Sequence, residues 1–105
     1  MKSQFFLKDH KLGILVPHLA LEWEQYTYNE QQKIISEWEN IRGNIPDRIR
    51  ELEQQINQKQ ERLDIEEDFN ISCRLNSEIA ELASKINDLW LLYRTNQDLS
   101  TKPHQ

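Results

Sequence analysis

The chain has 105 residues, of which 37% are hydrophobic and 30% are charged, and its formal net charge is −5. This composition fits one small all-α domain whose helices each bury a single narrow stripe, while two glycines and three prolines argue against a turn-rich β-fold. The acidic balance argues against nucleic acid or an anionic membrane as a partner, because phosphate groups are bound by clustered Lys and Arg.

The cysteine content and the first apolar run both bear on the compartment. Cys73 is the single cysteine, so the chain cannot form an internal disulfide, which fits a reducing compartment. The longest apolar run near the start, residues 12–16, is interrupted by Gly13 and followed by Pro17. This run is too short for a signal peptide or a membrane span, and the sequence therefore predicts a cytoplasmic protein.

Residues 1–16 are predicted to form an apolar N-terminal arm. Two short apolar runs, residues 4–7 and 12–16, flank the polar residues 8–11, so this segment is either a small hairpin or an irregular arm. A two-stranded hairpin alone is only marginally stable in water. The arm is therefore expected to lie against the helices or against a second subunit.

A single helical domain is predicted over residues 17–94, and one or two short helices begin it. Pro17 suits the first position of a helix because its missing N–H has no partner there in any case. A short helix is therefore expected from Pro17 to about Tyr26.

The second short helix is predicted over about residues 30–42. Thr27 and Glu30 have the spacing of a capping box at its start, with Asn29 as a competing cap. Gly43 is expected to end this helix in the left-handed conformation. The apolar face of the helix then contains Ile34, Ile35, Trp38 and Ile41.

Two longer helices, residues 46–66 and 72–94, are predicted to form an antiparallel helical hairpin that is the core of the fold. Pro46 opens the first of them, and Lys59 occupies the place of a missing apolar residue in its heptad pattern. The apolar residues of that pattern are Ile49, Leu52, Ile56 and Leu63. The second helix has an uninterrupted seam of alternating four- and three-residue spacing, formed by Leu75, Ile79, Leu82, Ile86, Leu89 and Tyr93.

The connection between these two helices is inferred from the register of their seams. The two seams are out of register by two residues, which indicates a turn between about residues 66 and 72, with Asn70 or Ser72 as the cap of the following helix. A bent continuous helix is the alternative, because residues 64–72 contain neither Gly nor Pro. Residues 95–105 have no apolar period and are predicted to be a disordered tail.

Carboxylates near this turn give the first candidate chemistry. Glu61 and Asp64 have ExxD spacing, Glu78 and Glu81 have ExxE spacing, and residues 64–68 are a denser acidic group that could bind a metal or simply be solvated. The two pairs resemble the carboxylate arrangement of the all-α nucleotide pyrophosphohydrolases, with the order of the pairs reversed. The resemblance implies a metal-dependent enzyme that holds Mg²⁺ between helices and hydrolyses nucleoside triphosphates.

A second resemblance concerns the last predicted helix. Ser84, Asp88 and Leu91 match the spacing of a Ser-x-x-Leu-Asp-x-Leu-Ile pattern, with Asn87 and Trp90 in place of two leucines. This segment is similar to the second helix of the small sporulation aspartyl-phosphate phosphatases. The resemblance implies a phosphorelay regulator, a helical hairpin that acts on a phosphorylated response regulator.

The apolar residues near the end of the last helix carry the main functional prediction. Residues 89–92 read Leu-Trp-Leu-Leu, and a helical turn that is apolar on nearly every side must be buried on nearly every side. Either the N-terminal elements cover this turn within one subunit, or part of it is a self-association or partner surface. The sequence predicts a non-enzymatic interaction or regulatory protein that acts through helix–helix contacts and dimerises, with no assigned catalytic, cofactor or metal site. The residues expected at or beside its contact surface are Trp38, Leu89, Trp90 and Leu92.

Overall fold

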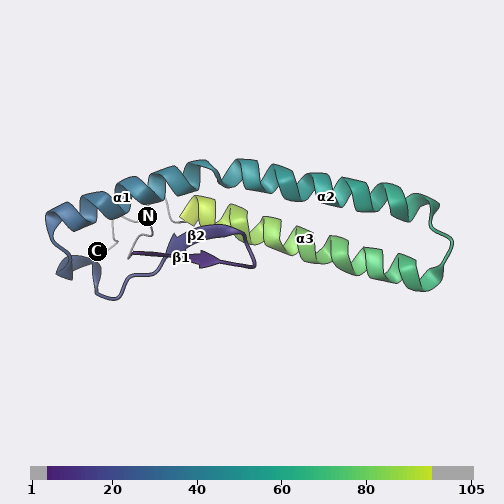
Figure 1. The fold of residues 1–105 in the computed structure, drawn as a ribbon, viewed down its shortest axis with the longest axis horizontal. Coiled ribbons are helices and arrows are strands. Elements are labelled where there is room, and N and C mark those ends of the chain that lie inside the picture. Colours follow the sequence, from purple (N-terminus) through teal and green to yellow (C-terminus); the bar gives the residue numbers. More distant parts are fainter. Residues whose placement is uncertain (1–4, 96–105) are drawn as a thin grey trace.

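The computed structural model describes residues 5–95, and over these residues the protein is mostly helical. Figure 1 shows an elongated molecule, with principal dimensions of 59 × 34 × 20 Å. Residues 1–4 of the predicted arm and residues 96–105 of the predicted tail lie outside the described residues. In chain order the elements are β1 (Phe6–Asp9), β2 (Ile14–Pro17), the 3₁₀ helix η1 (Trp23–Gln25), α1 (Tyr28–Gly43), α2 (Ile45–Ile65) and α3 (Phe69–Thr95).

Helices α1 and α2 follow one another as a single bent rod, with only Asn44 between them (Figure 1). Asn44 keeps a right-handed conformation, with φ −93° and ψ −4°, and its carbonyl accepts a 3.2 Å bond from the N–H of Arg48. Pro46 lies in the first turn of α2, as predicted. The predicted left-handed end at Gly43 is wrong, because the chain passes from α1 into α2 without reversing and needs no residue of positive φ there.

Helix α3 lies beside α2 and runs in the opposite direction (Figure 1). Residues 66–68 are not helical and join the two, so the chain turns between them and does not continue as a bent helix. Several residues of the predicted heptad patterns are buried, namely Ile49 and Leu52 of α2 and Leu75, Leu82 and Leu89 of α3. Ile56 and Leu63 are partly buried, and Ile45, which the predicted pattern did not include, is also buried.

The start of α3 differs from the prediction. Its cap is Asp68, whose carboxylate oxygen Oδ1 accepts bonds from the N–H groups of Asn70 (2.9 Å) and Ile71 (3.1 Å). Asn70 and Ser72 are therefore not the cap. The apolar seam locates the buried part of a helix, but the first turn of α3 begins with the exposed Phe69 and lies outside that seam.

The N-terminal segment forms an antiparallel β-hairpin, so the all-α prediction is incomplete. The hairpin is one of the two alternatives that the apolar runs allowed, and its register pairs Leu7 with Val16 and Lys8 with Leu15. At its turn, the side chain of Asp9 accepts a 2.9 Å bond from the N–H of Leu12. Two strands alone are marginal, and this pair lies against the helices (Figure 1).

Pro17 ends β2 instead of opening a helix, so the predicted helix over residues 17–26 is wrong. The N–H of His18 donates to the carbonyl of Phe5 at 2.8 Å, and the ladder alternates, so Pro17 occupies a position whose N–H points out of the ladder. Only η1 forms in the segment that follows. The predicted capping box of Thr27 and Glu30 is confirmed, with bonds of 3.1 and 2.9 Å at the start of α1.

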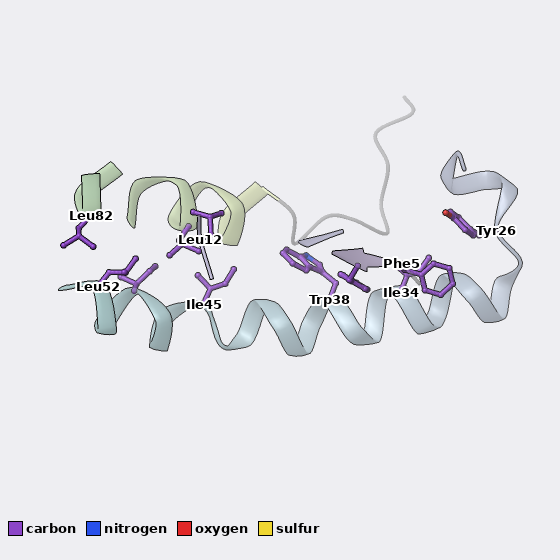
Figure 2. Packing of buried hydrophobic residues seen from close by; sticks show 11 residues of the cluster. Phe5, Leu12, Tyr26, Ile34, Trp38, Ile45, Leu52 and Leu82 are labelled. Atoms are coloured by element: carbon purple, nitrogen blue, oxygen red, sulfur yellow. The ribbon is translucent and has the colours of Figure 1, made fainter. Parts of the chain in front are cut away.

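One main core cluster runs along the α1–α2 rod and is closed on its other side by the β-hairpin and the end of α3 (Figures 1 and 2). The ring of Trp38 stacks on Phe6 with centroids 6.3 Å apart, and the ring of Phe5 meets Tyr26 edge-on at 5.6 Å. The hairpin thus covers the part of α1 that contains Trp38. The cluster comprises Phe5, Phe6, Leu12, Tyr26, Ile34, Trp38, Ile45, Ile49, Leu52, Leu82 and Leu89.

Candidate functional site

The four residues predicted for a contact surface have different environments. Trp38 and Leu89 are 1% and 0% exposed and belong to the main core cluster of a single chain. Leu92 is partly buried against this cluster, whereas Trp90 is 37% exposed. Leu89 and much of Leu92 are therefore covered within one chain, whereas Trp90 and Leu91 keep exposed surface, and a contact through Trp90 stays a prediction.

The exposed residues Trp90 and Leu91 form what we name the α3-end patch. The ring of Trp90 meets Tyr93 edge-on with centroids 5.7 Å apart, and the guanidinium of Arg42 lies 5.6 Å from the centre of the Tyr93 ring. These contacts connect the end of α3 to α1 and hold Trp90 in place. Both Trp90 and Leu91 retain exposed apolar surface.

A second exposed apolar site lies at the opposite end of α3. Ile65 and Phe69 are 79% and 77% exposed, which are the highest values among the large apolar side chains of residues 5–95. Ile65 ends α2 and Phe69 begins α3, so they stand on either side of the connecting loop (Figure 1). We name residues 65–69 the tip. This site was not predicted from the sequence. The available signal was that both apolar residues fall outside the heptad seams.

The tip lies beyond a polar layer that interrupts the α2–α3 contact. The ammonium Nζ of Lys59 and a carboxylate oxygen of Glu78 are 3.0 Å apart. This hydrogen bond, together with the positive charge of Lys59, lowers the pKa of Glu78. Leu75 is buried in this part of the helix pair but does not belong to the main core cluster. The segment from this layer to the tip, residues 59–78, is named the α2–α3 arm, or simply the arm.

The tip and the adjoining last turn of α2 are strongly acidic. Between Glu61 and Asp68 the sequence has five carboxylates and one arginine. Two of the carboxylates also shape the loop, since Glu66 accepts a 3.2 Å bond from the N–H of Asp68, and Asp68 caps α3. Two large apolar side chains are thus presented in a field of negative charge.

The carboxylates proposed for metal binding are not gathered into a metal site. Within residues 5–95, no three His, Cys, Asp or Glu side chains are grouped so that they could hold a metal ion, and this range includes Glu61, Asp64, Glu78 and Glu81. Glu78 is engaged by Lys59 across the helix pair. The ExxD and ExxE spacings therefore do not converge in the folded chain.

Ser84, one of the residues of the second resemblance, lines a cavity of about 360 Å³ between α3 and the hairpin turn. Its lining includes Lys11, Glu81, Ser84 and Lys85, and Lys11 also forms a 3.4 Å ion pair with Asp88. Both partners of this ion pair are well exposed, so water competes for it. The lining of the cavity combines two ammonium groups, a hydroxyl and a carboxylate, and Asp88 pairs with Lys11 beside it.

Two further findings concern the whole chain. No helix in the described part of the chain is both long enough and apolar enough to cross a lipid bilayer. In comparisons with known proteins, no family model, no curated protein and no solved structure matches this chain.

Proposed function

We propose that the chain is a non-enzymatic interaction or regulatory protein that binds another protein through the tip of its α2–α3 arm. The observation that carries this proposal is the exposure of Ile65 and Phe69, the two most exposed large apolar side chains of the described chain, which flank the short loop between α2 and α3. Exposed apolar groups are costly in water and typically mark contact sites on proteins that remain in solution.

The position of the arm supports the same proposal. The main core cluster involves the β-hairpin, α1 and the adjoining parts of α2 and α3, and it does not include the residues of the tip. The two helices nevertheless continue past the polar layer of Lys59 and Glu78 (Figure 1). Because the tip of this arm does not belong to the main core cluster, its side chains are free to contact a partner without disturbing that cluster.

Self-association is a second candidate function, and the α3-end patch favours it. Trp90 and Leu91 lie side by side on α3 and keep exposed apolar surface. Aromatic side chains are enriched in protein interfaces because they bury a large area with few rotatable bonds. Under this proposal two copies contact each other through the ends of their α3 helices.

The enzymatic and phosphorelay alternatives receive less support from the geometry. A metal-dependent hydrolase requires carboxylates that converge, and those at positions 61, 64, 78 and 81 do not form such a group. A phosphorelay role requires Asp88 to reach a response regulator, and such a partner would have to replace the exposed 3.4 Å contact between the carboxylate of Asp88 and the ammonium of Lys11.

The proposal is tested by photo-cross-linking in the native host. A benzophenone amino acid replaces Phe69 at the tip, and in a matched control chain it replaces Tyr28, an aromatic residue that is 72% exposed at the start of α1. We expect a discrete adduct from position 69 that is absent from position 28 and is weakened when Ile65→Ser is added. Identical adducts from both positions, or none from position 69, would contradict a binding role for the tip.

A further inference from the structure

The tip combines two properties that together restrict its partner. Ile65 and Phe69 provide apolar surface, and five carboxylates and one arginine lie close to them in the sequence between positions 61 and 68, which makes this end of the molecule negatively charged. Specific interfaces pair an apolar centre with a rim of complementary charge. The partner surface must therefore supply an apolar hollow and a rim of opposite sign.

The other described segments of this chain do not cover the tip. Ile65 and Phe69 remain 79% and 77% exposed when all of residues 5–95 are in place. The apolar surface of the tip is therefore open to a partner in this structure.

A second copy of the chain is also a poor occupant. Two tips brought together would place like charges face to face, which opposes association. The cavity beside Lys11 and Lys85 has basic groups, but Glu81 also lines it and Asp88 already pairs with Lys11. An anionic lipid surface repels the tip for the same electrostatic reason.

We propose that the tip inserts Ile65 and Phe69 into an apolar pocket of a different protein, and that lysine and arginine side chains rim this pocket. This inference rests on the proposed function and adds the chemistry of the partner. The apolar residues supply most of the affinity, while the carboxylates at positions 61, 64 and 67 favour a basic partner and speed the encounter.

The inference is tested with peptides of defined chemistry and the full chain. The probe is a labelled amphipathic helical peptide of Leu and Lys, and its binding is measured by fluorescence anisotropy. Two control peptides keep the same pattern but replace Lys by Glu or Leu by Ser. We expect the Leu–Lys peptide to bind at least about tenfold more tightly than either control, and more weakly as salt rises.

Matched variants locate the binding site. The pair Ile65→Ser and Phe69→Ser should weaken binding of the Leu–Lys peptide by about tenfold or more, because it removes the apolar contact. The pair Leu7→Ser and Leu21→Ser, exposed apolar residues away from the tip, should leave binding unchanged.

Charge variants test the role of the carboxylates. The double variant Glu61→Gln with Glu67→Gln should weaken binding and reduce its salt dependence. The matched double variant Glu39→Gln with Glu53→Gln, which removes two carboxylates away from the tip, should change neither.

The outcomes separate this inference from the proposed function. If the Leu–Glu peptide binds as tightly as the Leu–Lys peptide, the inference that the partner is basic is wrong. If the Leu–Lys peptide binds equally well after Ile65 and Phe69 are replaced, the inference that these residues form the apolar contact is wrong. If the cross-link from position 69 still forms in either case, the tip binds a partner of other chemistry and the proposed function stands. Loss of both the cross-link and the peptide binding overturns both proposals.

Discussion

Gly13 and Arg48 fix the turn of the β-hairpin onto α2. Gly13 has φ +77°, and the guanidinium of Arg48 lies so close that a Cβ at Gly13 would be 2.7 Å from its nitrogen Nη2. The nitrogen Nε of the same arginine donates a 2.9 Å bond to the carbonyl of Leu12. The glycine thus meets two demands, a left-handed backbone and room for the cation.

Gly13→Ala should therefore lower the free energy of unfolding by about 1–2 kcal/mol, because it adds left-handed strain and displaces Arg48. Urea denaturation followed by circular dichroism measures the change. Gly43→Ala is the matched control, since Gly43 is helical and a Cβ added there would meet nothing within 4 Å. This control should be neutral or stabilising by up to about 1 kcal/mol. Equal effects of the two substitutions would contradict the role of Gly13.

The ion pair of Lys59 and Glu78 makes the stability of the fold depend on pH. The pKa of Glu78 lies below its ordinary value of 4.5 in the folded chain, chiefly because Lys59 donates a hydrogen bond to its carboxylate. The unfolded chain binds this proton at higher pH than the folded chain does. The pair therefore stabilises the fold above pH 4.5, and its contribution is lost as the pH falls through the lowered pKa.

Glu78→Gln should reduce this part of the pH dependence. Between neutral pH and pH values below 4.5, the variant should lose less stability than the original chain, because it has no carboxylate to protonate at this position. Urea midpoints measured across this range provide the comparison. Glu53→Gln, which changes an exposed carboxylate of α2, should follow the original curve. A Glu78→Gln curve that also coincides with the original would contradict the assignment.

At the scale of elements, the start of α3 depends on one carboxylate. Asp68→Ala removes the acceptor of two N–H groups in the first turn and should destabilise the chain by about 1 kcal/mol. Asn70→Ala, which changes an exposed residue of the same turn, is expected to have little effect on the urea midpoint. An effect of Asn70→Ala as large as that of Asp68→Ala would show that the cap is not specific to Asp68.

The long helices could be predicted from sequence because their seams repeat. The buried residues Leu75, Leu82 and Leu89 recur every seven positions, and the register shift between the seams predicted the turn that residues 66–68 form. The N-terminal segment could not be predicted to the same degree. The conformation of Pro17 depends on its pairing with Phe6, a contact that local sequence does not encode.

The candidate sites show the same division. The sequence predicted Trp38 at or beside a contact surface. Only the fold shows that the hairpin covers Trp38 by stacking Phe6 on its ring. Ile65 and Phe69 received no attention because they lie off the seams. Their importance depends on the loop that brings the two helix ends to one point, and therefore on the arrangement of α2 and α3.

At the scale of the whole molecule, burial is concentrated at one end. The main core cluster combines the hairpin, α1 and the adjoining parts of α2 and α3, while the tip stands apart with its apolar and acidic residues (Figure 1). Among the exposed apolar residues of the described chain, those of the α3-end patch and of the tip lie at opposite ends of α3. The acidic tip disfavours self-contact, so self-association should depend on the α3-end patch alone.

Sedimentation equilibrium over a wide range of protein concentration tests this division. We expect the mass of the original chain to rise from 12.7 kDa toward twice that value, and Trp90→Ala to remain near 12.7 kDa with its helicity largely intact, since Trp90 is 37% exposed. Phe69→Ser should associate like the original chain, because the tip takes no part in this contact. A mass of 12.7 kDa for the original chain at every concentration would exclude self-association through Trp90 and leave the tip as the remaining proposed contact site. Dissociation by Phe69→Ser would instead show that two copies meet through their tips, against the electrostatic argument.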